Sequence, residues 1–170
     1  TVDEVQRSGD VTQTTPATTS YDNELALYPP AQKVITGSWA QSENYDDYVV
    51  RITAQQGRTI TGGKWTRPDI SILGIKTYPY LPQRYFDIVT FEIKPANQVT
   101  VEGIFEALSH QQISNRSYVI FHVTELKTDE AFSEKYPEST RILSIARKHG
   151  IGVILATAID DWNTWDEIIP

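Results

Sequence analysis

The stretch that decides how this chain folds is 86–95, which reads Phe-Asp-Ile-Val-Thr-Phe-Glu-Ile-Lys-Pro. Its β-branched and aromatic residues predict a strand, and Pro95 closes it because proline has no N–H to donate to a sheet ladder. Side chains alternate between the faces of a strand, so Glu92 and Lys94 project together while Phe91 and Ile93 project the other way. The stretch therefore places a carboxylate beside an ammonium, opposite a buried face.

A second carboxylate leads into an earlier apolar run. Asp69 follows Pro68 and precedes Ile-Ser-Ile-Leu at 70–73, which predicts another strand with a buried face. Two carboxylates and a lysine on such strands predict a site for a divalent cation and an activated water.

Composition limits the class of protein. At 170 residues the chain is long enough for one domain. No run approaches the roughly 20 apolar residues of a membrane-spanning helix, and the start of the chain lacks the pattern of a signal peptide. The absence of cysteine excludes disulfides and thiolate metal sites, so a cytoplasmic location is expected. Because the chain begins with Thr1 and has no methionine, we expect a piece of a longer protein.

The net charge of -7 argues against strong sequence-independent binding of nucleic acid by this segment alone. If the domain acts on nucleic acid, another domain or subunit is expected to deliver the substrate. No membrane partner is expected.

Hydropathy patterns predict the remaining elements. Residues 1–22 read as a disordered tail or linker, and residues 23–170 as the folded domain. Helices are expected over 23–38 (bent or restarted at Pro29 and Pro30), over 101–114 after a Thr100 cap, and from Pro137 to Gly150. A last helical turn is expected within 161–169. Strands are expected at 48–53, 58–61, 69–73, 86–94, 118–123 and 151–155, with a surface loop over 74–84.

This order of helix, strands, helix, strand, helix and strand predicts an α/β fold with a mixed β-sheet flanked by helices. On the 101–114 helix the expected buried stripe is Val101, Ile104, Phe105 and Leu108. Glu102, Glu106 and His110 follow at four-residue spacing along another side, for which an ordinary exposed face is the favoured interpretation.

The candidate site residues suit phosphodiester hydrolysis. That reaction needs a hard cation that neutralises developing charge and lowers the pKa of a bound water. Asp69, Glu92 and the backbone carbonyl of Ile93 offer the oxygen ligands that Mg²⁺ prefers, with Mn²⁺ as an alternative ion. Lys94 can orient or deprotonate the attacking water, or stabilise the transition state.

Pro68-Asp69 and Glu92-Ile93-Lys94, within this order of elements, resemble the PD-(D/E)XK nuclease superfamily, which has the restriction-endonuclease-like αβββαβ core. The resemblance covers roughly residues 23–157. It implies that Asp69 and Glu92 are metal ligands, that Lys94 is the catalytic lysine, and that Glu24 on the first helix approaches the metal. A helix N-terminal acid is an equal reading of Glu24. Where some members carry Gln-x-x-x-Tyr, this chain departs with Glu106-Ala-Leu-Ser-His110.

Other polar residues have structural interpretations. His122 is expected to be a core histidine and His149 to end a helix, and three scattered histidines argue against zinc. Lys64, Trp65 and Arg67 form a basic and aromatic group that suits either a phosphate backbone or packing at the sheet edge.

The sequence thus predicts a Mg²⁺-dependent endonuclease domain that binds DNA in preference to RNA. Since cutting both strands of a duplex needs two active sites, a homodimer is one expectation. The first alternative is a catalytically inactive module of the same fold that binds nucleic acid or a protein. The second is an assembly or sensing domain that uses the Tyr- and Pro-rich loop at 78–85.

Overall fold

A computed structural model describes residues 23–54, 67–123 and 129–170. Within these ranges the strands form one mixed sheet in the order β1-β2-β3-β4-β5-β6. The pairs β1–β2, β2–β3 and β5–β6 are antiparallel, whereas β3–β4 and β4–β5 are parallel. The strand bounds are β1 Asp47–Ile52, β2 Ile70–Thr77, β3 Arg84–Lys94, β4 Arg116–His122, β5 Gly152–Ala156 and β6 Trp165–Ile169.

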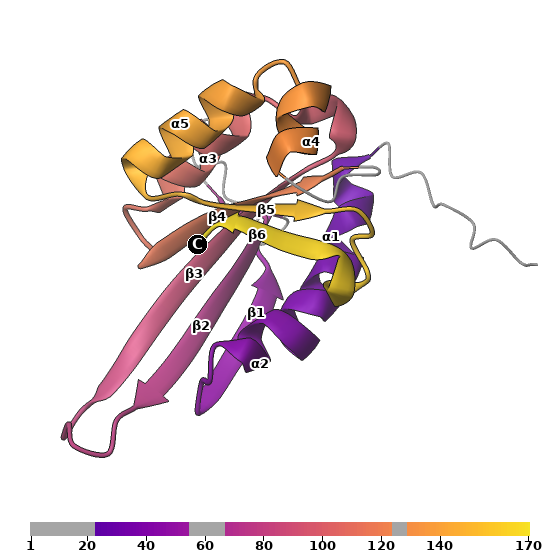
Figure 1. The fold of residues 1–170 in the computed structure, drawn as a ribbon. Coiled ribbons are helices and arrows are strands. Elements are labelled where there is room, and N and C mark those ends of the chain that lie inside the picture. Colours follow the sequence, from indigo (N-terminus) through magenta and orange to yellow (C-terminus); the bar gives the residue numbers. More distant parts are fainter. Residues whose placement is uncertain (1–22, 55–66, 124–128) are drawn as a thin grey trace, which may run out of the picture.

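Helices cover both faces of this sheet (Figure 1). One face carries α1 (Glu24–Val34), the π-helical η1 (Ile35–Trp39) and α2 (Ala40–Ser42). The other carries α3 (Val101–His110), α4 (Asp129–Lys135) and α5 (Ser139–His149). Short 3₁₀ turns lie at η2 (Ala96–Gln98) and η3 (Trp162–Thr164). The predicted mixed sheet flanked by helices is confirmed.

The sheet separates two apolar cores because alternate residues of its central strands face opposite ways. Under α1 and η1, Trp39 meets Phe91 edge-on with ring centroids 5.1 Å apart, and Phe91 stacks on Tyr118 at 5.4 Å. On the other face Phe121 packs with Ile104 of α3 and the apolar residues of α5. Glu92 and Lys94, at the end of β3, are buried but belong to neither apolar core.

The helix does not restart at Pro29 and Pro30, one of the two outcomes predicted there, since α1 runs through both prolines and the helical segment continues to Ser42. The carbonyls that lose their i+4 donors belong to Leu25 and Ala26, which are exposed. Water can satisfy these carbonyls, so the prolines cost the helix less than they would on a buried side.

The predicted loop over 74–84 is wrong, because β2 extends to Thr77 and β3 starts at Arg84. Gly74 reads as a strand breaker in sequence, but it pairs with Asp87 inside the ladder. The ring of Tyr45 fills the space beside it, 2.3 Å from where a Cβ would stand. The glycine therefore makes room for a packed ring, and the hairpin projects beyond the helices as a long arm (Figure 1).

The helix predicted over 101–114 is shorter than expected, and a different set of its residues is buried. It ends at His110, and Thr100 makes no side-chain cap. Instead, Glu138 accepts a hydrogen bond from the Val101 N–H at 2.9 Å. Phe105, expected in the buried stripe, is 37% exposed, whereas Gly103 and Ala107 are buried.

Two elements were not anticipated. The α4 helix precedes α5, and residues 165–169 form an edge strand paired with β5, so the helical turn predicted within 161–169 is limited to the 3₁₀ turn Trp162–Thr164. The α5 helix ends at Gly150, as predicted, with φ of 65° in the left-handed region that suits glycine. The predicted tail at 1–22, strand at 58–61 and residues Lys64 and Trp65 lie outside the described residues. Among the helices that are described, none has the length and apolar content to cross a bilayer.

Candidate functional site

The antiparallel pairing of β2 and β3 brings the predicted carboxylates together. Ile70 pairs with Phe91, so Asp69, one residue before β2, comes next to Glu92 on the same face. The Asp69 N–H donates to the Phe91 carbonyl at 3.1 Å, and the Ile93 N–H donates to Asp69 Oδ2 at 2.8 Å. Asp69 is 4% exposed and Glu92 is 5% exposed, so both carboxylates are buried and fixed by the sheet.

Lys94 lies at the centre of the cluster. Its Nζ is 2.9 Å from Glu92 Oε1, 2.5 Å from Glu106 Oε2 and 3.4 Å from Glu24 Oε2. A buried ammonium is stable only where carboxylates compensate its lost hydration, and here α1, β3 and α3 each supply one. The predicted proximity of Lys94 and Glu92 is therefore present, together with a third carboxylate from α3.

The first turn of α1 delivers Glu24. Asn23 caps the helix by accepting from the Leu25 N–H at 3.1 Å. Tyr28, one turn later, donates its hydroxyl to Glu24 Oε1 at 2.7 Å. Glu24 is thus more than a helix-terminal acid, because it is oriented toward β3 by a buried tyrosine. Tyr28 was missed in the sequence, although its spacing of four from Glu24 was a usable signal.

Glu24, Asp69 and Glu92 each place a carboxylate oxygen within 4.8 Å of the others. This spacing suits a hard cation bound by one oxygen from each side chain. Ile93 contributes its N–H to Asp69, and the role predicted for its carbonyl oxygen stays a prediction.

The two buried carboxyls resist ionisation in this arrangement. Burial, followed by the Glu92 charge, raises the pKa of Asp69 to about 8, although hydrogen bonds from Tyr28 and the Ile93 N–H lower it. Burial, followed by a hydrogen bond with Glu106, raises the pKa of Glu92 to about 8 against the pull of Lys94. The Lys94 ammonium at 2.9 Å opposes this rise, but four carboxyl groups crowd around a single lysine, so the pKa of Glu92 stays above its usual range.

Burial disfavours the charged form of Lys94, but the adjacent carboxylates, Glu92 foremost, outweigh it and raise its pKa. Lys94 is therefore an ammonium at neutral pH. Of the roles considered for it, orienting a water and stabilising negative charge suit this protonation state, and proton abstraction does not.

The α3 helix turns two further side chains toward the cluster, so the expected exposed face for Glu106 and His110 is wrong. Glu106 contacts Lys94, and His110 is 3% exposed. His110 Nε2 lies 3.5 Å from Glu92 Oε2, and it has no hydrogen-bond partner. Burial lowers the pKa of His110, so the ring is neutral and its Nε2 is a buried polar atom directed at the carboxylates. Glu102 of the same series is exposed, as expected.

Three further polar candidates lie in the described part of the chain. Arg67 is partly exposed in the segment before β2, His122 is buried within β4, and His149 ends α5. Burial lowers the pKa of His122, consistent with a core histidine.

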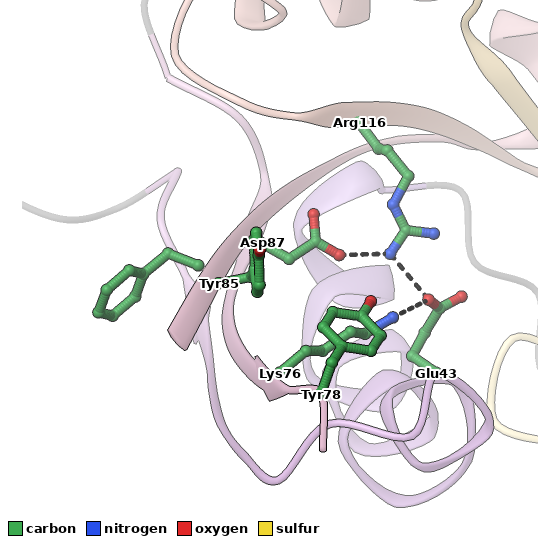
Figure 2. A pocket seen from close by; sticks show the side chains of 7 residues that line it. Glu43, Lys76, Tyr78, Tyr85, Asp87 and Arg116 are labelled. Atoms are coloured by element: carbon green, nitrogen blue, oxygen red, sulfur yellow. Dashed lines mark hydrogen bonds and ion pairs between the residues drawn. The ribbon is translucent and has the colours of Figure 1, made fainter. Parts of the chain in front are cut away.

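A second polar cluster, not anticipated from the sequence, lies at the base of the arm. Arg116 Nη2 contacts Asp87 at 2.6 Å, Glu43 at 2.8 Å and the Tyr45 hydroxyl at 3.0 Å. Lys76 reaches Glu43 from the other side at 3.4 Å (Figure 2). Two cations balance two carboxylates here, so the charges of this cluster are compensated without a ligand.

Comparison of the chain with protein-family models, with curated proteins and with solved structures gives no significant match.

Proposed function

We propose that this chain is a metal-dependent nuclease domain that hydrolyses phosphodiester bonds, with DNA preferred to RNA as the substrate. The observation that carries the proposal is the convergence of Glu24, Asp69 and Glu92 within 4.8 Å beside the Lys94 ammonium. The resemblance of Pro68-Asp69 and Glu92-Ile93-Lys94 to the PD-(D/E)XK superfamily supports it, and the preference for DNA depends on that resemblance alone.

The residues present fit a divalent cation. The cluster has an excess of carboxylates, the pKa of Asp69 and that of Glu92 are raised, and His110 Nε2 is buried without a hydrogen bond beside them. Asp69 and Glu92 would hold Mg²⁺ or Mn²⁺, with Glu24 and the Ile93 carbonyl as further ligands. Such an ion supplies charge neutralisation and lowers the pKa of a bound water.

In this proposal the water oxygen attacks phosphorus, and the bond from phosphorus to the leaving sugar oxygen breaks. Lys94, as an ammonium, orients the water and stabilises the charge that develops on the phosphoryl oxygens. The proton released by the water passes to a carboxylate of the cluster or to solvent. Glu106 holds Lys94 in place, and Tyr28 holds Glu24.

The test is cleavage of supercoiled plasmid and of matched DNA and RNA oligonucleotides, with Mg²⁺ or with EDTA. We expect Mg²⁺-dependent cleavage that falls by about a hundredfold or more in Glu92→Gln and in Lys94→Met. Glu102→Gln, an exposed change on α3, is the matched control and should cleave like the wild type. Equal cleavage by all variants would refute the assignment.

One observation favours the alternative of a catalytically inactive binding module, because Lys94 already provides a cation among three carboxylates. Calorimetric titration with Mn²⁺ separates the two. A catalytic site should take up Mn²⁺ in the wild type and lose this uptake in Asp69→Asn. A purely internal charge cluster should show no uptake in either protein.

A further inference from the structure

On the sheet face that carries α3, the described helices cover only part of the sheet. The apolar core beneath α3, α4 and α5 contains no residue of β1, β2 or β3. The α3 helix ends at His110, and the residues after it run along β3, where the Ser114 hydroxyl lies 3.4 Å from that of Thr90 and Asn115 hydrogen-bonds the backbone of Ile88. Beyond that point the sheet continues through β1, β2 and the first half of β3 without a helix on this face among the described residues (Figure 1).

An apolar row crosses this uncovered area. Val49 pairs with Leu73, and Leu73 pairs with Ile88, so the three side chains lie side by side across β1, β2 and β3. They are 38%, 40% and 37% exposed, and Phe86, one step further along the same face of β3, is 61% exposed. The opposite face of β2 is buried through Ile70 and Ile72. A strand that is apolar on both faces is typical of a sheet covered on both sides.

Opposite charges flank the apolar row on β1. Asp47 and Arg51 stand two residues before and two residues after Val49, so both share its face, and both are exposed. A half-turn about an axis along the row would exchange these two positions. The surface is therefore complementary to itself, as a two-fold interface requires.

We propose that the apolar row of Val49, Leu73 and Ile88 is the centre of a two-fold homodimer contact, with the axis along the row. Arg51 of each copy then lies opposite Asp47 of the other, and the two apolar rows pack face to face as in stacked sheets. This inference names the face of the dimer and does not depend on the nuclease proposal.

The arrangement of the helices leaves room for such a contact. β4 begins at Arg116, opposite Val89, and α3 contacts β3 at Glu92 through His110 and at Lys94 through Glu106. The described helices of this face lie towards the end of β3 that carries Lys94, and the arm projects from the opposite end of β2 and β3 (Figure 1). The half-turn places the helices of one copy beside the arm of its partner, where no strand beyond β3 and no helix of the described residues lies.

The test is sedimentation equilibrium of the full chain over the micromolar to submillimolar range, with EDTA present so that metal plays no part. The wild type should form dimers. Leu73→Glu should weaken self-association by about a hundredfold or more, because two carboxylates would be buried without partners. Tyr80→Glu, at a 96% exposed position on the tip of the arm, is the matched control and should dimerise like the wild type.

Charge reversal tests the orientation and remains informative if Leu73→Glu fails to fold. Arg51→Glu alone and Asp47→Lys alone should each weaken dimerisation by about fivefold, because each creates two like-charge contacts. An equal mixture of the two variants should recover it as a heterodimer, in which both contacts join opposite charges.

A wild type that stays monomeric over the whole range would overturn the proposal and assign the row to another occupant, either residues 1–22 of the same chain or a different protein. A folded Leu73→Glu variant that dimerises normally would overturn it as well. Failure of the mixture to recover association would exclude this axis.

Discussion

Among the individual residues, Asp69 stabilises the sheet but is buried where its ionised form is disfavoured. Its carboxylate accepts a hydrogen bond from the Ile93 N–H, and its own N–H donates to the Phe91 carbonyl of β3. Yet burial and the Glu92 charge raise the pKa of Asp69 to about 8. The folded state therefore binds a proton at a pH where the unfolded chain, with a pKa of about 3.9, has lost it.

The sign of this linkage gives a prediction for the metal-free protein. Where the folded state binds more protons than the unfolded state, the free energy of unfolding falls as pH rises, here from about pH 4 towards about pH 8. Asp69→Asn cannot titrate, and its amide oxygen can still accept from Ile93. Urea unfolding at several pH values in EDTA should show a flatter dependence for Asp69→Asn than for the wild type. An equally steep dependence in both proteins would contradict this interpretation.

At the level of elements, the arm formed by β2 and β3 depends on one close approach. A Cβ at Gly74 would lie 2.3 Å from Cε1 and 2.5 Å from Cδ1 of Tyr45. The ring cannot easily move, because its hydroxyl donates to Asp87 and accepts from Arg116. The glycine thus couples the strand pairing of the arm to the polar cluster at its base.

Gly74→Ala should therefore destabilise the domain by about 1–3 kcal/mol through overpacking. Gly37→Ala is the matched control, since a Cβ there meets nothing within 4 Å and alanine is favoured in helical segments by about 1 kcal/mol. Urea denaturation of the two variants provides the measurement. Equal stability of both variants would show that the Tyr45 ring relocates at no cost.

At the scale of the whole molecule, Arg116 joins parts of the chain that are far apart in sequence. It links β4 to Asp87 of β3 and to Glu43 in the segment between α2 and β1 (Figure 2). It also donates to the hydroxyl of Tyr45 in that segment. Its guanidinium also lies over the Trp39 ring, 5.4 Å from the centroid. The cluster therefore connects the α1 side of the sheet to the base of the arm.

Arg116→Met should cost about 1–3 kcal/mol of folding free energy, because two partly buried carboxylates lose their main donor. Arg84→Met, at an exposed strand end, is the control and should change stability by less than about 0.5 kcal/mol. Thermal and urea unfolding would measure both. A similar small loss in each variant would mean that water replaces the guanidinium.

The sequence was sufficient for features that depend on local periodicity. The period of two in 86–94 put Glu92 and Lys94 on one face, and the order of elements predicted a mixed sheet with helices on both sides. Asp69 and Glu24 were also identified as candidates, and the structure brings both to Glu92. Their roles in metal binding and catalysis stay predictions until metal binding and cleavage are measured.

Tertiary structure alone decided which side of α3 faces the sheet. Glu106 and His110 reach the cluster because Gly103 lets the helix come close, with its Cβ position 3.2 Å from Lys94 Cγ. Tertiary structure also determined that residues 165–169 form a strand, because they pair with the free edge of β5. The periodicity of a helix or a strand identifies its faces, but which neighbour a face meets depends on contacts between residues distant in sequence. The secondary-structure preferences of neighbouring residues do not specify those long-range contacts.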